Sequence, residues 1–204
     1  MINNKITFLI NASNLKSGGG LQDTDSIGGQ LEKFPQHRFI VVLSKFLETT
    51  SERIKDYDNV DVFYYDIPTN IMTVVFGHDQ FLDRIVKEKD VQAMLMVLDP
   101  SRWELKVPHL SDFALPQLVI LESSYLGRMG KAEHVKWLFW CMIRKWSLKR
   151  RVNAFWTENP FISDKLEALM EGEVQVVNER IEFRVSSRIV DSDAAWSGER
   201  RVVA

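Results

Sequence analysis

The residues best suited to chemistry come early in the chain, where glycines follow a short apolar run. The stretch Lys5–Gln22 begins with a run typical of a strand buried on both faces. Gly18, Gly19 and Gly20 follow, and a helix is expected from Leu21. Backbone N–H groups of such a turn can face a phosphate, and the helix adds its positive end. The triplet matches neither the dinucleotide fingerprint nor a P-loop. It therefore predicts either a phosphate contact or a purely structural turn.

A second candidate segment is the long loop Pro100–Pro116, which follows the expected strand Val91–Leu98. In open α/β sheets, ligands bind at the carboxyl ends of strands, and long loops there are often functional. Arg102 and Trp103 offer a cation and a stacking ring for a charged or sugar-like ligand, and His109 could carry a proton. The alternative is a packed loop in which Trp103 is core and His109 only forms hydrogen bonds.

The third candidate is the helix expected over Lys131–Arg151, which has two contrasting faces. One face is apolar, and we expect it to pack on the sheet: Val135, Leu138, Phe139, Met142, Ile143 and Trp146. The other face interleaves aromatic rings with cations, as in a helix that lies on a membrane surface: Trp137, Trp140, Arg144, Leu148 and Arg151. The alternative is that another helix covers these rings.

Alternating strands and helices must position these candidates. The pattern predicts an α/β, Rossmann-like, doubly wound and mostly parallel sheet of about seven strands. Besides the two strands above, we expect strands at His37–Leu43, Val60–Tyr65, Gln117–Leu121, Asn153–Thr157 and Val174–Val177. The expected helices are Leu21–Phe34, Phe46–Tyr57, Ile71–Lys89, Lys131–Arg151 and Pro160–Met170. The first is weak, because Gly28 and Gly29 in its interior cost about 1 kcal/mol each relative to alanine.

Composition narrows the class of protein. The 204 residues are 45% hydrophobic with a net charge of -2, which favours a folded domain and gives no pull toward nucleic acid. The single Cys141 cannot form an intrachain disulfide, and the scattered histidines do not suggest a metal site. We find no signal peptide and no apolar stretch of roughly 20 residues that could span a membrane. We therefore expect a cytoplasmic protein.

The chain divides into two segments by composition. Residues 1–178 follow the α/β pattern, whereas residues 179–204 contain no lysine and five arginines, and their hydrophobic period dissolves. This atypical tail, expected to be irregular, has either a foreign origin, such as a shifted reading frame, or is an ordinary polar extension.

Three segments, in order, carry a family resemblance: I-N-A-S-N-L-K-S-G-G-G-L-Q, P-S-R-W…V-P-H-L-S-D-F-A-L-P, and A-F-W-T-E-N-P-F-I-S-D-K-L. Together, over Ile2–Asn178, they resemble the N-terminal domain of bacterial group 1 (family 4) glycosyltransferases, which have the two-domain GT-B fold. The resemblance implies transfer of a sugar from a nucleotide-sugar donor to a glycan or lipid-linked acceptor, as in polysaccharide biosynthesis. It implies no bound cofactor and no metal.

The same resemblance assigns roles to residues of this chain. Gly18, Gly19 and Gly20 would face the donor phosphates across the interdomain cleft. On the acceptor side would lie Asn14, Arg102 and Trp103, with His109 as a catalytic group. The family's second domain binds most of the donor, and the chain ends before it, so we expect a truncated half that is inactive alone.

Two alternatives to a glycosyltransferase domain remain. One is a Rossmann-type module that binds a nucleotide or phosphate without catalysis. The other is a peripheral domain that contacts the inner face of the membrane through the Trp137, Trp140, Arg144 and Arg151 face.

Overall fold

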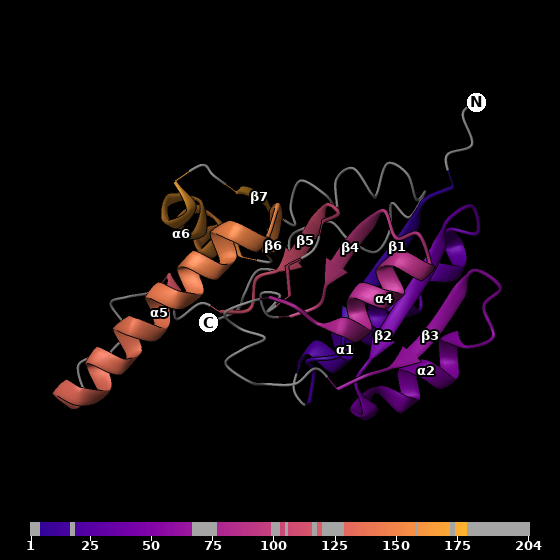
Figure 1. Ribbon diagram of the computed structural model, residues 1–204, viewed down its shortest axis with the longest axis horizontal. Helices are drawn as coiled ribbons and strands as arrows, with labels where there is room; N and C mark the ends of the chain where they lie inside the picture. The colour runs from indigo at the N-terminus through magenta and orange to yellow at the C-terminus, as the bar shows by residue number, and fades with distance from the viewer. Residues whose placement is uncertain are drawn as a thin grey trace, which may run out of the picture.

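Seven parallel strands form one sheet in the computed structural model, in the order β3-β2-β1-β4-β5-β6-β7 (Figure 1). The structure describes residues 5–16, 19–66, 77–98, 103–104, 106–115, 118–119, 129–157, 159–171 and 174–178. The strands are β1 (Thr7–Ala12), β2 (Arg38–Leu43), β3 (Val60–Tyr64), β4 (Ala93–Met96), β5 (His109–Asp112), β6 (Ala154–Thr157) and β7 (Gln175–Asn178). Every adjacent pair is parallel. This confirms the Rossmann-like α/β class.

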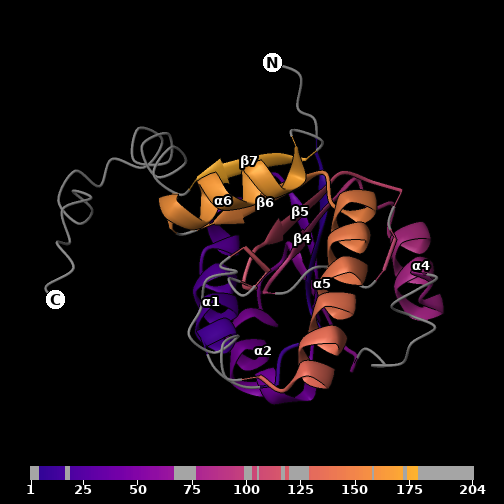
Figure 2. The same cartoon turned by 90° about the vertical axis from the view of Figure 1, so that its left-hand side faces the viewer.

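Helices cover both faces of the sheet, as Figure 2 shows for α1 and α2 on one side and α4 on the other. The described helices are α1 (Gly19–Gly28), α2 (Glu48–Ile54), α4 (Gln80–Glu88), α5 (Lys131–Arg151) and α6 (Pro160–Met170). Two short 3-10 helices, η1 (Leu31–Lys33) and η2 (Lys45–Leu47), precede β2 and α2 respectively. Residues 71–76 of the expected helix Ile71–Lys89, and the whole tail 179–204, lie outside the described residues.

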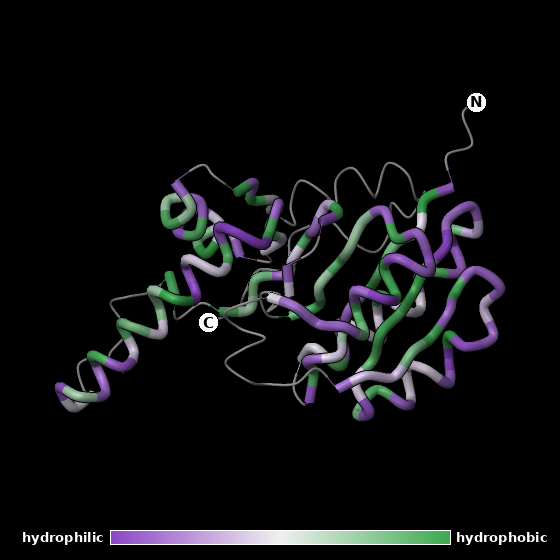
Figure 3. Tube along the Cα trace, in the orientation of Figure 1, coloured by the Kyte–Doolittle hydropathy of each residue, from purple (hydrophilic) through white to green (hydrophobic). Residues whose placement is uncertain are grey.

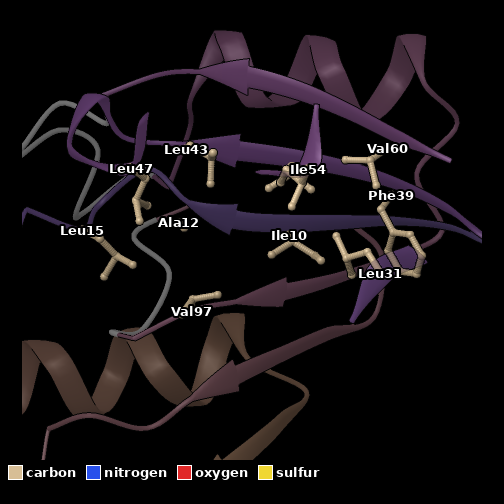
Figure 4. Close-up of a cluster of buried hydrophobic side chains, with 11 residues drawn as sticks. Ile10, Ala12, Leu15, Leu31, Phe39, Leu43, Leu47, Ile54, Val60 and Val97 are labelled. Atoms are coloured by element: carbon tan, nitrogen blue, oxygen red, sulfur yellow. The ribbon is translucent and has the colours of Figure 1, made fainter. Parts of the chain in front are cut away.

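The core of the β1–β4 half follows from strict alternation along β1 and β2. Ile10 of β1 joins a cluster on the α1 and α2 side, and its neighbour Leu9 joins a second cluster on the α4 side. Val41 and Ile40 of β2 divide in the same way. Figure 4 shows the first cluster, where side chains from β1, β2 and α2 meet. Because both faces are covered, the strands read as continuous apolar runs.

The two glycines that weaken the first helix have a packing role. The helix α1 ends at Gly28, earlier than the expected Phe34. A Cβ at Gly28 would lie 3.2 Å from Cγ2 of Ile54, so glycine allows α1 and α2 to approach closely. Arg53 of α2 lies over Gly29, and its Nη1 donates to Oδ2 of Asp25 at 2.7 Å. Glycine lowers the helix propensity at these positions, but it allows the end of α1 to pack closely against α2.

The fifth strand is not where the hydrophobic pattern predicts it. We expected Gln117–Leu121, of which only Leu118 and Val119 are among the described residues, but β5 is His109–Asp112, inside the segment expected to be irregular. Leu118 and Val119 form a turn and are buried in the cluster around α5 and α6. A polar strand such as H-L-S-D is recognisable only from its neighbours, because β4 and β6 pair with it on both edges.

The two faces of α5 are the reverse of those expected. Of the six residues on the apolar face predicted to pack on the sheet, five are exposed and Ile143 is half-buried. The face predicted to point outward carries the buried Leu148 and Arg151, and Trp140 packs against the same cluster. Only the carboxyl end of α5 packs firmly on the sheet, and Figure 1 shows its amino end extending away from the strands. The amphipathic pattern predicts which residues share a face of this helix, but it does not predict which of the two faces packs against the rest of the fold.

The last helix matches its prediction at both ends. Asn159 caps α6 by accepting a hydrogen bond from the N–H of Phe161 at 2.9 Å, and Pro160 follows at the first helical position. Glu171 closes the helix in a left-handed conformation with φ of 57°.

Candidate functional site

The strand order marks one point of the sheet as the expected ligand site. From β1 the chain moves to β2 and β3 on one side, then returns to β4 on the other side of β1. The carboxyl ends of β1 and β4 are therefore neighbours at a topological switch point, where open α/β sheets bind ligands. The glycine turn follows β1 and the long loop follows β4, so the first two sequence candidates begin at the same edge.

The glycines of this edge have separable roles. A Cβ at Gly20 would lie 2.1 Å from Cδ1 of Leu98 and 2.9 Å from Cδ2 of Leu15, so Gly20 seats α1 against the end of β4. A Cβ at Gly19 would meet nothing within 4 Å. Gly19 is exposed at the amino end of α1, where backbone N–H groups are open to an anion. Gly18 lies outside the described residues.

Two asparagines at the carboxyl end of β1, one inside the strand and one just after it, have buried polar atoms without partners among the described residues. Nδ2 of Asn14 donates to the carbonyl of Leu98 at 2.5 Å, which ties the ends of β1 and β4 together. Oδ1 of Asn14 is buried without a hydrogen bond. Oδ1 of Asn11 accepts from Ser13, whereas its buried Nδ2 has no partner. Such atoms cost free energy unless a ligand or water satisfies them.

The backbone at this edge departs from ordinary geometry. Leu98, two residues after the end of β4, has φ of 44°, a left-handed conformation that a leucine adopts only when its surroundings hold it there. The Asn14 hydrogen bond and the close contact with Gly20 supply that support.

The electrostatics of the α1 amino end favour an anion. Its first turn contains no acidic residue. Asp25, further along the helix, pairs with Arg53. Asp23 lies two residues before Asp25, after the first turn, and burial raises the pKa of its carboxyl group. The positive end of α1 is therefore not opposed by a carboxylate in its own turn.

Trp103 is core rather than a stacking platform in this conformation. Its ring is 1% exposed, and Nε1 donates to Oδ1 of Asp83 on α4 at 2.7 Å. It packs in the α4-side cluster with Leu9 and Leu82. The acceptor-side role of Trp103 stays a prediction that this burial does not support. Arg102 lies outside the described residues.

His109 lies at the amino end of β5, on the edge of the sheet opposite the switch point. The ring is 1% exposed, and Nδ1 donates to the carbonyl of Arg151 at 3.0 Å, at the end of α5. Its backbone N–H donates to Oδ1 of Asn153 at 2.8 Å. Burial lowers the pKa of His109 to about 4, against the opposing effect of the Arg151 carbonyl. The ring closes the end of a helix, and its catalytic role stays a prediction without support from this geometry.

The predicted membrane-facing residues are divided between the surface and the core. Arg151 is 4% exposed, and its Nη1 donates to Oγ of Ser147 at 3.0 Å. The Arg144 guanidinium lies 5.2 Å from the centre of the Trp140 ring. Trp137 and Trp140 are half-buried. The structure therefore does not bring these four residues onto one exposed face.

An open cavity of about 380 Å³ lies at the amino ends of β1, β2 and β3, far from the switch point. Lys5, Arg38, Asn59 and Asp61 are among its lining residues. Arg38 and Asp61 already pair across it at 2.6 Å. It is a surface hollow between strand starts, so it does not compete with the switch point as the candidate site.

Sequence reasoning named the glycines but overlooked the buried polar groups that end the strands. Asn11 is the second-last residue of β1, Ser111 is the second-last residue of β5, and Thr157 ends β6, all nearly or fully buried. Oγ1 of Thr157 has no hydrogen-bond partner among the described residues. A polar residue that closes an apolar strand is a signal that could have found Asn11 and Thr157.

Comparisons with known proteins give a distant likeness of fold. No known protein family and no curated protein matches the sequence. Among solved structures, the fold is similar to UDP-glucose: anthocyanidin 3-O-glucosyltransferase in complex with UDP, with 12% identity and a TM-score of 0.48. The match covers 87% of this chain and 53% of that structure, so the chain spans about half the length of that protein.

Two further findings concern the described residues only. They contain no cluster of three or more histidine, cysteine or acidic side chains placed to hold a metal ion. No helix among them combines the length and the apolar composition needed to cross a membrane.

Proposed function

We propose that this domain takes part in sugar transfer from a nucleotide-sugar to a glycan or lipid-linked acceptor, with phosphate contact at the amino end of α1. The observation that carries the proposal is the pair of buried, unpartnered polar atoms on Asn11 and Asn14 beside that helix start. They lie at the β1 and β4 switch point, where a ligand would satisfy them. The three segments that resemble family 4 glycosyltransferases supply the class of reaction.

The domain has the acceptor-side role in this proposal. The resemblance assigns most nucleotide contacts to a second domain, and the described residues form a single α/β domain. We therefore expect the chain alone to bind nucleotide-sugars weakly and not to turn them over, with no metal required. Hydrolysis or transfer of UDP-glucose by the purified chain would contradict this expectation.

A substitution at Gly19 tests phosphate contact without disturbing the fold. Gly19→Asp places a carboxylate at the helix start, where it suits the helix but repels an anion. Gly19→Asn is the matched neutral control, since a Cβ at this position has open space. Titration of UDP and UDP-glucose followed by NMR should show binding to wild type and to Gly19→Asn. Binding to Gly19→Asp should be weaker by about tenfold.

Equal affinity of the two Gly19 variants would reject phosphate contact at α1. The alternative function, a nucleotide- or phosphate-binding module without catalysis, is separated by its ligands. A sugar-transfer domain should bind glycans as well as the nucleotide-sugar, and saturation-transfer NMR with a panel of oligosaccharides detects this. Binding of nucleotides alone, unchanged by the attached sugar, would favour the module.

A further inference from the structure

An exposed apolar stripe runs along α5, on the face that the sequence pattern predicted to be buried. Its members are Val135, Leu138, Phe139, Met142 and Trp146, whose exposed fractions are 66%, 50%, 59%, 60% and 47%. Their spacing of three and four residues places them on one side of the helix. Figure 3 shows hydrophobic residues recurring along α5 where it extends from the sheet.

The fold does not need this stripe for its own core. Only Ser147, Leu148 and Arg151 of α5 are buried, and all three belong to its last turns. Single exposed apolar residues are ordinary, but five on one continuous helix face are typical of an interaction surface. The stripe is therefore available to a partner outside the described fold.

The charge of α5 indicates the chemistry of that partner. The helix contains seven lysines or arginines and a single acidic residue, Glu133, although the whole chain has a net charge of -2. Lys131 and Lys136 are exposed toward its amino end. With about 3.6 residues per turn, Lys145 borders the stripe on one side and Arg150 on the other. Both also form ion pairs within the fold, Lys145 with Glu171 at 3.2 Å and Arg150 with Glu104 at 3.1 Å. The exposed Lys131 and Lys136 therefore contribute most of the charge available to a partner. Arg150 also lies over the Trp146 ring at 5.4 Å.

We propose that the apolar stripe of α5 lies in the headgroup region of a bilayer that contains anionic lipids. Leucine, phenylalanine and tryptophan on one face, with bordering lysine and arginine, are the composition of helices that lie in a membrane interface. Anionic headgroups complement the positive charge of the helix. A second copy of the chain is the poorer occupant, because pairing would bring two strongly cationic helices together.

Vesicle flotation with matched variants tests this docking surface. The stripe variant is Leu138→Gln/Phe139→Gln/Met142→Gln. The control is Phe46→Gln/Phe161→Gln, which changes exposed aromatic rings on η2 and α6 instead. All five side chains are at least half exposed, so both variants should retain the wild-type circular dichroism spectrum.

Wild type and control should float with vesicles of phosphatidylglycerol and phosphatidylcholine, and much less with phosphatidylcholine alone. The stripe variant should bind at least about tenfold more weakly. Lys131→Glu/Lys136→Glu should lose a similar factor on anionic vesicles only, since each cation near such a surface adds attraction.

Three results would overturn the proposal. Wild type that does not float with anionic vesicles is one, and a stripe variant that floats as wild type is another. The third is a wild-type dimer in sedimentation equilibrium that the stripe variant loses without any vesicle binding, which would assign the stripe to a second copy. None of these results depends on nucleotide-sugar binding at Gly19.

Discussion

The two halves of the sheet are built differently. In the β1–β4 half, β1 and β2 have six residues each and feed clusters on both faces, closed by α1, α2 and α4. In the β5–β7 half, every strand has four residues, and one cluster joins α5 and α6 to the sheet. The first half is a closed core, whereas the second supports a helix that is only partly packed.

The difference shows where function can be added to such a fold. The closed half fixes the ends of β1 and β4, and with them the candidate phosphate site. The open half leaves most of one helix face uncovered, and with it the proposed membrane surface. A well-packed region can hold a rigid site, while a sparsely packed region can present an extended surface.

Truncation of buried leucines should give the largest contrast between the halves. Leu43→Ala in β2 and Leu148→Ala in α5 both empty sites with 0% exposure. We expect Leu43→Ala to lower the free energy of unfolding by about 4 kcal/mol and Leu148→Ala by about 2, since α5 can relax around the cavity. Urea unfolding followed by circular dichroism measures both. Equal losses would show that the halves are equally well packed.

Acid should weaken the β5–β7 half through His109. Because burial lowers its pKa to about 4, the unfolded chain binds more protons than the folded chain between that pH and about 6.5. The free energy of unfolding should therefore fall as pH drops through this window, by up to roughly 3 kcal/mol, with no further loss from this ring below it.

His109→Asn retains a donor for the Arg151 carbonyl and removes the titrating ring. We would measure the urea midpoints of wild type and His109→Asn at pH 7 and at pH 4.5. The loss of stability between the two pH values in wild type, minus the same loss in the variant, gives the contribution of His109, because the other titrating groups are common to both proteins. Parallel pH dependence in wild type and variant would show that the ring is not buried in solution.

Helix caps should give the smallest contrast. Asp79 caps α4 through the N–H groups of Phe81 and Leu82 at 3.0 Å each, is buried, and also accepts from Tyr65. Burial and this acceptor raise the pKa of Tyr65. Asn159 caps α6 at the surface. Asp79→Ala should cost about 2 kcal/mol and Asn159→Ala about 1, measured by thermal unfolding. A larger loss of stability for Asn159→Ala than for Asp79→Ala would contradict the prediction that the buried cap of α4 contributes more than the surface cap of α6.

The sequence predicted the closed half well because pattern and burial agree there. An apolar run such as F-I-V-V-L of β2 predicts a strand that is buried on both faces, and a doubly wound sheet covers both faces of its inner strands with helices. The bounds of α5 and α6 were confirmed because their caps and periodicity are local. The glycine turn was found for the same reason, although sequence could not separate the packing role of Gly20 from the open position of Gly19.

The open half was predicted less well because its burial depends on tertiary contacts. The H-L-S-D segment of β5 is a strand only between β4 and β6, so its polar residues gave no local signal. The faces of α5 were reversed because which face is covered depends on neighbours far along the chain. Trp103 was likewise predicted to bind a ligand, because its burial depends on a hydrogen bond to Asp83 of α4 that the local sequence does not indicate.

The position of β1 between β2 and β4 has a kinetic consequence. Its first partner, β2, follows closely in sequence, but Phe8 also pairs with Ala93 of β4, which is synthesised much later. Long-range parallel pairing is slow, because the chain must close a large loop before the contact stabilises it. During synthesis the β3-β2-β1 unit is therefore expected to form first, with the outer edge of β1 unpaired until β4 arrives. This unpaired edge of β1, a strand whose carboxyl end later forms part of the candidate phosphate site, is thus the part of the nascent chain most exposed to misassembly.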